Sequence, residues 1–277
     1  MSVFSERKID CHNHIFDPVQ FPYQPDSRYH PQAHETATAD YFHWVLDAYG
    51  VSHALIVGPN SGYGDMHNEA LLDAIEQSNG RFKGMAVVSP ECSLDQLAEL
   101  KAKGIVGVTF NVAFHGVDHM LSTRPLMDKA AELDMLVQFQ VQDDQLLPLA
   151  DHFRDCGARL VIDHCGRPNV AAGVESDGFK AVLAMAETGR TWIKVSGFEK
   201  YSAEPFPFND TLPFVQAIQT AFGEDRLLWG SDWPFLLAGQ RMDYGTLLIL
   251  AEQHFPNAEQ RAKYFWKNAA DLYGFPV

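Results

Sequence analysis

Basic residues are scarce in this chain of 277 residues, in which 21 lysines and arginines stand against 36 aspartates and glutamates. The formal net charge at pH 7 is −15 with histidine counted as neutral. Such an acidic chain lacks the positive surface that binds nucleic acid or an anionic membrane. We therefore expect a small-molecule partner, no nucleic acid and no membrane, whereas the sequence leaves the oligomeric state unknown.

Cysteine is also rare, and long apolar runs are missing. Cys11, Cys92, Cys156 and Cys165 are scattered and form no Cys-x-x-Cys pair. In a chain of this size they are typical of free thiols in a reducing compartment. The first residues contain no secretory apolar stretch, and no apolar run approaches the roughly 18 residues of a membrane-spanning helix. These absences predict a cytoplasmic protein.

Glycine-rich phosphate motifs are missing too, since neither G-x-G-x-x-G nor G-x-x-x-x-G-K occurs. This disfavours an open doubly wound sheet. Instead, apolar strand-like segments alternate with stretches of helical spacing, which predicts an α/β chain folded as a (β/α)8 TIM barrel, with residues 1–277 as a single domain. The eight expected strands are Ile9–Phe16, His53–Pro59, Phe82–Pro90, Gly107–Phe114, Met135–Gln142, Arg159–Gly166, Thr191–Gly197 and Leu227–Pro234.

Three further segments have a recognisable character. The stretch Asp17–Thr38, rich in proline and histidine, is long for a connection and is expected to be an active-site loop after the first strand. In Ser93–Lys103 a serine precedes Gln96 by three residues, as in a helix capping box. Asn257–Tyr273 is expected to form a closing helix at the end of the chain.

Histidines and an aspartate stand at the ends of three expected strands. His12 and His14 are two residues apart on the first strand, so their side chains project to the same side. His164 ends the sixth strand and Asp232 ends the eighth. Barrel active sites form at the carboxyl ends of the strands, and the first and eighth strands are neighbours in a closed barrel. The four residues are therefore predicted to form one site, with Cys11 and Cys165 pointing away from it.

Four motifs give the chain a specific resemblance. They are His-x-His on the first strand, Asp-His-x-Gly-Arg-Pro on the sixth, Lys-Val-Ser-Gly on the seventh and Trp-Gly-Ser-Asp-Trp-Pro on the eighth. These motifs resemble those of the amidohydrolase superfamily. The resemblance is to its amidohydrolase-2 branch, which contains 2-pyrone-4,6-dicarboxylate lactonase and related lactonases. It spans the chain from Ile9 to Phe275 and implies a barrel enzyme that opens a lactone.

The resemblance also bears on metal binding. Metal-dependent members of the superfamily add a bridging Lys or Glu on strand four and a histidine on strand five. Here those strands read Val-Thr-Phe-Asn-Val-Ala-Phe and Val-Gln-Phe-Gln-Val-Gln, which supply no strong ligand. We expect a site without a metal or other cofactor. The alternative is a single Zn²⁺ held by His12, His14, His164 and Asp232.

The expected activity is that of a lactonase-type hydrolase, a carboxylic ester hydrolase acting on a small organic or sugar acid. Asp232 would be the general base for water, and His12, His14 and His164 would polarise the carbonyl. Thr109 and His115 stand where the resemblance implies arginines around strand four, so a less charged lactone is favoured over a dicarboxylate. Candidates for substrate binding are Arg167 for an anionic group, with Lys194, Asn68, Asn111, Gln140 and Tyr29.

Three other functions remain open from the sequence. A zinc-dependent decarboxylase of the same branch would use the same strand-one and strand-eight residues, and metal analysis would distinguish it. A lactone isomerase would share the activation of the carbonyl, and only its product would differ. A non-catalytic binding protein is the third alternative, and the presence of all four site residues weighs against it.

Overall fold

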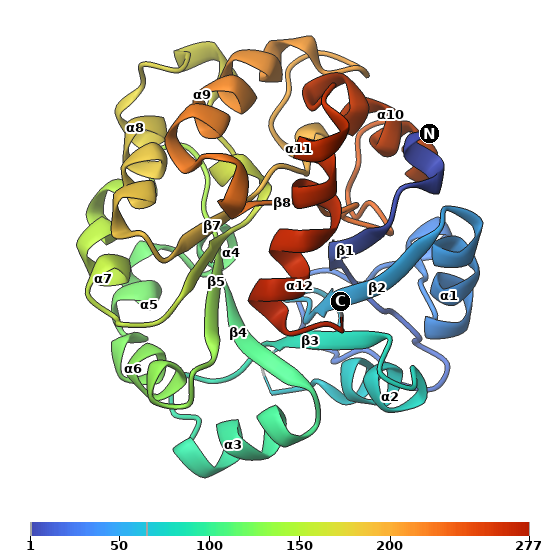
Figure 1. The fold of residues 1–277 in the computed structure, drawn as a ribbon. Coiled ribbons are helices and arrows are strands. Elements are labelled where there is room, and N and C mark those ends of the chain that lie inside the picture. The colour runs from blue at the N-terminus through green and yellow to red at the C-terminus, as the bar shows by residue number, and fades with distance from the viewer. Residues whose placement is uncertain (1, 65, 277) are drawn as a thin grey trace.

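The computed structural model describes residues 2–64 and 66–276, whose eight strands form one parallel sheet curved into a barrel with helices outside it (Figure 1). Each strand pairs with the next along the chain, and every pairing is parallel. This confirms the predicted (β/α)8 barrel. The strands are β1 (Lys8–Asn13), β2 (Val51–Val57), β3 (Phe82–Ala86), β4 (Ile105–Asn111), β5 (Leu136–Gln140), β6 (Leu160–Ile162), β7 (Thr191–Lys194) and β8 (Leu227–Leu228).

The barrel is closed by the segment that follows β8. Cys11 N donates to Trp229 O at 3.0 Å, Asp232 N donates to His12 O at 2.8 Å, and His14 N donates to Trp233 O at 2.9 Å. An isolated parallel bridge also joins Asn13 to Trp233. The chain after β8 therefore runs along β1, and it carries Asp232 to the histidines of the first strand.

Helices cover the outside of the barrel because each has one apolar face. In α2 the buried residues Ala70, Leu71, Ala74 and Ile75 recur at helical spacing and pack inward. The capping box expected at Ser93 is present at the start of α3, where Ser93 and Gln96 bond reciprocally. The helices are α1 (Ala39–Ala48), α2 (Glu69–Gln77), α3 (Leu94–Ala102), α4 (Val112–His115), α5 (Val117–Leu121), α6 (Arg124–Glu132), α7 (Ala150–Arg154), α8 (Asp177–Ala184), α9 (Leu212–Phe222), α10 (Tyr244–His254), α11 (Ala258–Ala262) and α12 (Asn268–Tyr273).

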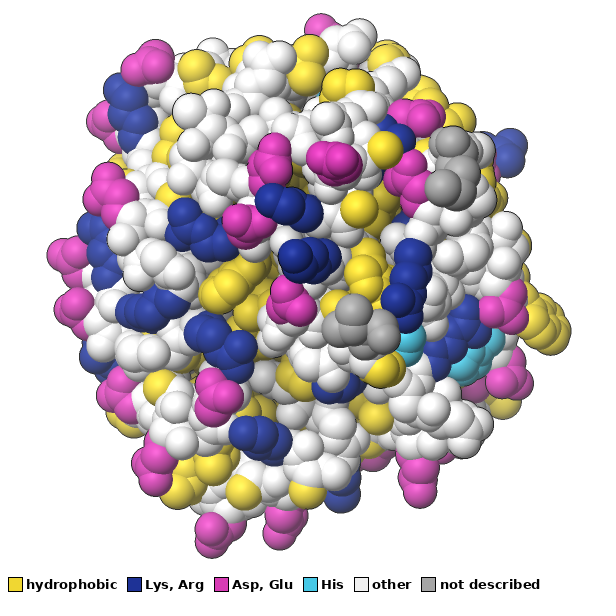
Figure 2. Space-filling view, in the orientation of Figure 1, with side chains coloured by type: hydrophobic (Ala, Val, Ile, Leu, Met, Phe, Trp, Pro, Cys, Tyr) yellow, Lys and Arg dark blue, Asp and Glu magenta, His cyan; other side chains and the backbone are white. Residues whose placement is uncertain are grey.

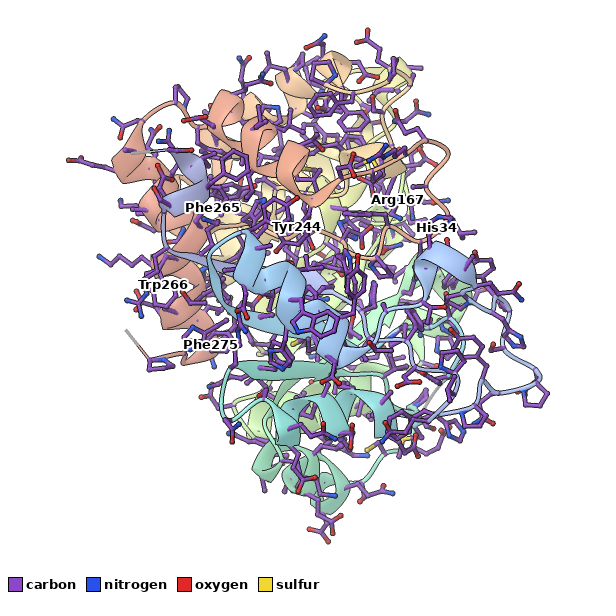
Figure 3. All side chains as sticks on the ribbon, turned by 90° about the vertical axis from the view of Figure 1, so that its right-hand side faces the viewer. His34, Arg167, Tyr244, Phe265, Trp266 and Phe275 are labelled. Carbon is purple, nitrogen blue, oxygen red and sulfur yellow. The ribbon has the colours of Figure 1, made fainter. Side chains whose placement is uncertain are left out.

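The end of the chain closes one mouth of the barrel. A π-helical turn, Lys263–Lys267, joins α11 to α12, and the whole segment lies across the barrel in Figure 1. Its Trp266, Tyr273 and Phe275 form a buried cluster with barrel residues such as Ile9 and Leu55. Figure 3 shows Trp266 and Phe275 at one end of the barrel and Arg167 at the other. The other end of the barrel, at the carboxyl ends of the strands, is thus free to form a functional site.

Several expected strands are too long at their carboxyl ends. The segment expected to be a strand through Phe114 leaves β4 at Asn111 and turns into α4, and the last expected strand is reduced to two residues. The sixth and eighth expected strands cannot extend through His164 and Asp232, whose φ values of 50° and 60° no strand allows. Helices α4, α5 and α10 were not among the predicted elements.

The surface carries charged side chains of both signs. On the face that α12 crosses, basic and acidic side chains are interspersed with small apolar areas (Figure 2). Among the described residues, no helix is both long enough and apolar enough to cross a membrane.

Candidate active site

A cavity of about 330 Å³ opens at the carboxyl ends of the strands. His12, His14, His164 and Asp232 all line it, so the structure brings together the four residues predicted to form one site. His12, His164 and Asp232 are at most 3% exposed. The other lining residues are Val57, Gly58, Pro59, Asn60, Ser61, Thr109, Phe110, Asn111, Ala113, Phe114, Gln140, Gln142, Asp163, Arg167, Glu199, Lys200, Leu236 and Leu237.

The three imidazoles converge on one oxygen of Asp232. Its Oδ1 lies 3.6 Å from His12 Nε2, 3.7 Å from His14 Nε2 and 3.7 Å from His164 Nε2. These separations exceed ordinary hydrogen bonds. They leave a small space between the four groups in which a water molecule, a substrate oxygen or an ion has several polar neighbours.

Two glycines allow the histidines to sit where they do. A Cβ on Gly230 would lie 2.7 Å from His12 Cβ, and one on Gly197 would lie 2.3 Å from His164 Nδ1. Gly197 also has a φ of 63°, a conformation that glycine adopts without strain. A larger residue at either position would displace an imidazole of the cluster.

A buried carboxylate below the cluster joins β1 to the segment after β8. Asp10 Oδ1 accepts from His12 N at 3.2 Å and from Ser231 N at 2.9 Å. Its Oδ2 accepts from Ser231 Oγ at 2.6 Å and from Tyr244 Oη at 2.9 Å. Asp10 therefore fixes the backbone on both sides of the cluster.

The second ring nitrogen of each histidine has a partner of its own. His14 Nδ1 lies 2.8 Å from Val57 O, and because a carbonyl oxygen only accepts, this nitrogen carries the hydrogen. Neutral His14 therefore presents a lone pair at Nε2. His164 Nδ1 lies 3.2 Å from Ser196 Oγ, a hydroxyl that either donates or accepts.

His12 is held from below by a buried charged network. Its Nδ1 lies 3.2 Å from Asp163 Oδ1 and 3.2 Å from Lys194 Nζ. Lys194 Nζ also lies 3.0 Å from Asp163 Oδ1 and donates to Gln138 Oε1 at 2.7 Å. Gln138 Nε2 in turn donates to Asp163 Oδ2 at 3.0 Å. Lys194 and Gln138 are fully buried, so the network is dry and rigid.

Lys200 and Glu199 form a second charged group in the cavity, which the sequence-based prediction missed. Lys200 Nζ lies 3.0 Å from Asp232 Oδ2 and 3.5 Å from Glu199 Oε1, and it donates to Leu236 O at 2.5 Å. The Glu199 side chain is only 1% exposed. The available signal was their position, because they follow Gly197, where the seventh strand was expected to end, with only Phe198 between.

Burial and neighbouring charges set the protonation of the cluster. Burial, reinforced by Lys194, lowers the pKa of His12, and burial lowers the pKa of His164 well below its usual range. Burial alone would raise the pKa of Asp232, but Lys200 and His164 hold it well below the ordinary value. Burial raises the pKa of Glu199 to about 7, with Asp232 contributing. At neutral pH the cluster thus holds the Asp232 carboxylate beside the neutral imidazoles of His12 and His164.

The predicted substrate-binding residues divide into two groups. Arg167, Asn111 and Gln140 line the cavity. Lys194 does not, because it is occupied in the network below His12. Asn68 bonds both polar atoms of its amide to the backbone of Val87. Tyr29 donates to Glu35 within the loop after β1, outside the cavity.

Two other sequence-based expectations concern the surroundings of the site. Cys11 and Cys165 are buried in apolar clusters and do not line the cavity, as expected. The stretch Asp17–Thr38 follows β1, but none of its residues lines the cavity. It lies behind lining residues instead, since Glu35 Oε1 accepts from Leu237 N at 2.7 Å and Arg28 donates to Phe114 O.

Comparison with known proteins places this site in a family. The amidohydrolase family model Amidohydro_2 matches residues 9–275, nearly the whole chain. The chain belongs to the amidohydrolase family.

Relatives of this amidohydrolase include two enzymes of similar length. It is 33% identical over 275 residues to 4-sulfomuconolactone hydrolase of Rhizobium radiobacter, covering 96% of this chain and 89% of that protein. It is 31% identical over 281 residues to 2-pyrone-4,6-dicarboxylate hydrolase of Comamonas testosteroni, with the same coverage of 96% and 89%. A crystal structure from Acinetobacter baumannii, described as a probable 2-pyrone-4,6-dicarboxylic acid hydrolase with citric acid bound, is 28% identical. Its TM-score is 0.84, over 97% of this chain and 99% of that one.

Proposed function

We propose that this amidohydrolase is a lactone hydrolase that opens the cyclic ester of a small organic or sugar acid. The observation that carries the proposal is the convergence of three histidine Nε2 atoms on Asp232 Oδ1 at the closed end of the cavity. A carboxylate beside neutral imidazoles can hold and deprotonate a water molecule and polarise a carbonyl. Three relatives that are at least 30% identical over most of the chain are named as hydrolases of lactones or pyrones.

Asp232 Oδ1 and His14 Nε2 are proposed to hold the attacking water. Asp232 Oδ1 is a hydrogen-bond acceptor. His14 Nε2 is also only an acceptor when His14 is neutral, because the single ring hydrogen then lies on Nδ1 and is donated to Val57 O. A water molecule between them would donate both its hydrogens and direct a lone pair at the carbonyl carbon. Asp232 then takes the proton as the new carbon–oxygen bond forms. When the tetrahedral intermediate collapses, Asp232 returns this proton to the ring oxygen as its bond to the carbonyl carbon breaks, which leaves the carboxylate ready for the next turnover.

His12 and His164 are proposed to donate to the carbonyl oxygen. Lys194 has three N–H groups and is fully buried. Among the described residues, its neighbours within hydrogen-bond distance are Gln138 Oε1, Asp163 Oδ1 and His12 Nδ1. All three hydrogens are bonded only if His12 Nδ1 accepts, which leaves the imidazole hydrogen on Nε2. His164 Nδ1 can accept from Ser196 Oγ in the same way. This assignment refines the sequence-based one, in which all three histidines donate.

The same four residues are the candidate ligands of a single Zn²⁺. Among the described residues, the ligand atoms of His12, His14 and Asp232 lie within 4.8 Å of one another, and His164 falls outside that group. Ligand atoms about 2.0–2.1 Å from a tetrahedral ion lie roughly 3.3–3.5 Å apart, so the spacing fits three of the four residues. The hydrogen-bond count favours the site without zinc: zinc would need the Nε2 lone pair, so the His12 hydrogen would sit on Nδ1 and be donated to Asp163 Oδ1, and one Lys194 hydrogen would be left without an acceptor. A bound zinc would polarise the carbonyl. We propose a metal-free site and derive no step through an ion.

Arg167 is proposed to bind an anionic group of the substrate. Its side chain lines the cavity, its Nε is buried without a hydrogen-bond partner, and within the described residues no carboxylate lies within 4.0 Å of it. Burial lowers the pKa of Arg167, but a guanidinium keeps its charge at neutral pH. A carboxylate or sulfonate of the substrate would supply the missing partner.

The first test is lactone hydrolysis by the wild-type chain and by the Asp232→Asn variant. Acid release from a panel of lactones should fall by about 10²- to 10⁴-fold in the variant, the range lost with a general base. The matched control is Asp151→Asn, whose carboxylate is 89% exposed on α7 and which should behave as wild type. Substantial residual turnover in a folded Asp232→Asn variant would contradict the assignment of the base.

The second test concerns the metal. Protein purified without added metal should contain less than one equivalent of zinc, and chelator should leave hydrolysis intact. One equivalent of tightly held zinc together with chelator-sensitive activity would overturn the metal-free proposal. If carbon dioxide were released instead of a hydroxy acid, the zinc-dependent decarboxylase would replace the hydrolase. An isomeric lactone as product would identify an isomerase.

We also propose the cytoplasm as the location of the protein. The supporting observation is that all four cysteines are buried free thiols, as expected in a reducing compartment.

A further inference from the structure

The wall of the cavity opposite the cluster is built from uncharged amides. β4 and β5 stand across the barrel from β8 and β1, and their last residues, Asn111 and Gln140, are partners in the β4–β5 register. Gln142, after β5, and Asn60, after β2, complete this amide wall. Each primary amide offers both donors and an acceptor but no charge.

Two of these amides are unused by the protein. In the described part of the chain, the side chains of Gln140 and Gln142 have no hydrogen-bond partner, whereas Asn111 Oδ1 accepts from Phe114 N at 3.1 Å and Asn60 Nδ2 lies 3.3 Å from His115 Nε2. Free amides that face a cavity are suited to hydroxyl and carbonyl groups of a ligand. Gln140 is the better placed of the two, because its strand position holds it beside Asn111.

Within the part of the chain that the structure describes, the charges of the cavity leave one free cation. Lys200 is shared between Asp232 and Glu199, and the buried Asp163 is neutralised by Lys194. Among the described residues, Arg167 has no such partner; it stands on the β6 side of the cavity, where its carbonyl accepts from Asp143 N, next to Gln142. The cavity can therefore pair one anionic group of a substrate with a cation. A second anionic group, placed at the amide wall, would lose its hydration without gaining a cation.

We infer that Gln140, with Asn111, selects a lactone that carries one anionic group and otherwise neutral polar groups. This inference rests on the proposed lactone hydrolysis and names the substrate class of that site. The ring carbonyl would lie at the His12 and Asp232 cluster, the single anion at Arg167, and hydroxyl or carbonyl groups at the amide wall. A cavity of about 330 Å³ suits a small single-ring substrate of this kind.

The experiment compares substrates that differ in charge. The monoanionic probes are 2-pyrone-6-carboxylate and an aldaric acid monolactone, the dianionic probe is 2-pyrone-4,6-dicarboxylate, and the uncharged probe is an aldonic acid lactone. We expect kcat/KM for the monoanions to exceed that for the dianion by about 10- to 100-fold, the effect of one uncompensated charged contact. Each monoanion should also exceed the uncharged lactone by at least about 10-fold.

A gain-of-function variant tests the amide wall directly. Gln140→Arg should raise kcat/KM for 2-pyrone-4,6-dicarboxylate relative to 2-pyrone-6-carboxylate by about 10-fold or more, because it places a second cation where the second carboxylate lies. The matched control is Gln253→Arg on α10, which adds the same charge at an exposed site outside the cavity and should leave the ratio unchanged.

The outcomes separate this inference from the proposed function. Hydrolysis with a preference for the dianion, or a ratio that does not change in Gln140→Arg, would overturn the inference and leave lactone hydrolysis standing. Failure of the wild-type chain to open any of the four probes would overturn both. A monoanion preference that Gln140→Arg reverses or removes, and Gln253→Arg does not, supports both.

Discussion

At the scale of single residues, the site depends on side chains that the substrate does not touch. Lys194 was expected among the substrate-binding residues, but it is 0% exposed and its ammonium is bound to Asp163, Gln138 and His12. It neutralises a buried carboxylate and fixes the imidazole that the reaction needs. A buried charge pair of this kind is costly to break, because the remaining partner is left without compensation.

Replacing Lys194 should therefore damage the whole molecule. We expect Lys194→Met to lower the free energy of unfolding by about 3–5 kcal/mol, since Asp163 loses its cation in a dry interior. Urea unfolding followed by circular dichroism measures the change. The matched control is Lys180→Met, which breaks an exposed pair with Glu175 and should cost less than about 1 kcal/mol. Equal stability losses in the two variants would contradict this role.

The backbone at the site is also decided residue by residue. Asp232 and His164 adopt left-handed φ values that are uncommon for residues other than glycine. The surrounding bonds hold them there, notably Asp232 N to His12 O and the four hydrogen bonds to Asp10. Strain of this kind is typical of functional sites, and here it directs both side chains into the cavity.

At the scale of elements, the loops after the strands form the cavity and hold one another in place. Glu35 in the loop after β1 is 5% exposed and accepts from Leu237 N and from Tyr29 Oη. Leu237 lines the cavity, as does Phe114, whose carbonyl accepts from Arg28 of the same loop. The loop after β1 thus supports the cavity walls from behind, without contributing a lining residue.

Breaking this support should weaken substrate binding. We expect Glu35→Ala to raise KM several-fold with a smaller effect on kcat, and to make the segment 17–38 more sensitive to limited proteolysis. The physical reason is the loss of two hydrogen bonds to a buried carboxylate, each worth about 1.5–3 kcal/mol. Glu76→Ala, an exposed site on α2, is the control. Wild-type KM and proteolysis in Glu35→Ala would show that the loop is held by other contacts.

At the scale of the whole molecule, buried histidines link folding to pH. Burial lowers the pKa of His254 from 6.5 to about 4, and its Nδ1 has no hydrogen-bond partner among the residues that the structure describes. Its ring packs edge-on against Phe198, whose ring centroid lies 5.0 Å away and which precedes Glu199 and Lys200. Between pH 6.5 and about 4, His254 is neutral in the folded chain and protonated in the unfolded chain. The unfolded state then binds more protons, so stability falls as the pH is lowered through this window.

Removing His254 should reduce that pH dependence. Between pH 7 and 4, the free energy of unfolding should fall by on the order of 3 kcal/mol more in the wild type than in His254→Gln. The figure follows from about 1.4 kcal/mol for each unit of pKa shift. Urea unfolding at pH 7, 6, 5 and 4 measures the difference. His34→Gln, at an exposed position, serves as the control. Parallel pH profiles for the wild type and His254→Gln would contradict the assignment.

The sequence by itself determined the barrel and the centre of its site. Alternating apolar segments can bury both faces of a parallel sheet only when helices cover it, and the carboxyl ends of such strands meet at one mouth. The positions of His12, His14, His164 and Asp232 at those ends were therefore enough to predict their meeting. Arg167 was predicted because it follows His164 closely and matches an anionic group. Asn111 and Gln140 were predicted as neutral hydrogen-bonding groups, and the structure shows that they end β4 and β5.

Only the tertiary structure decided which other polar groups serve the site. Lys194 lies one layer below the cavity, and Asn68 is engaged by the backbone of Val87, which no local pattern shows. Glu199 and Lys200 reach Asp232 because the chain turns at Gly197, and that turn depends on contacts with His164, which is 33 residues earlier in the chain. Strand periodicity fixes the direction of a side chain, whereas its partners depend on how distant segments pack around it.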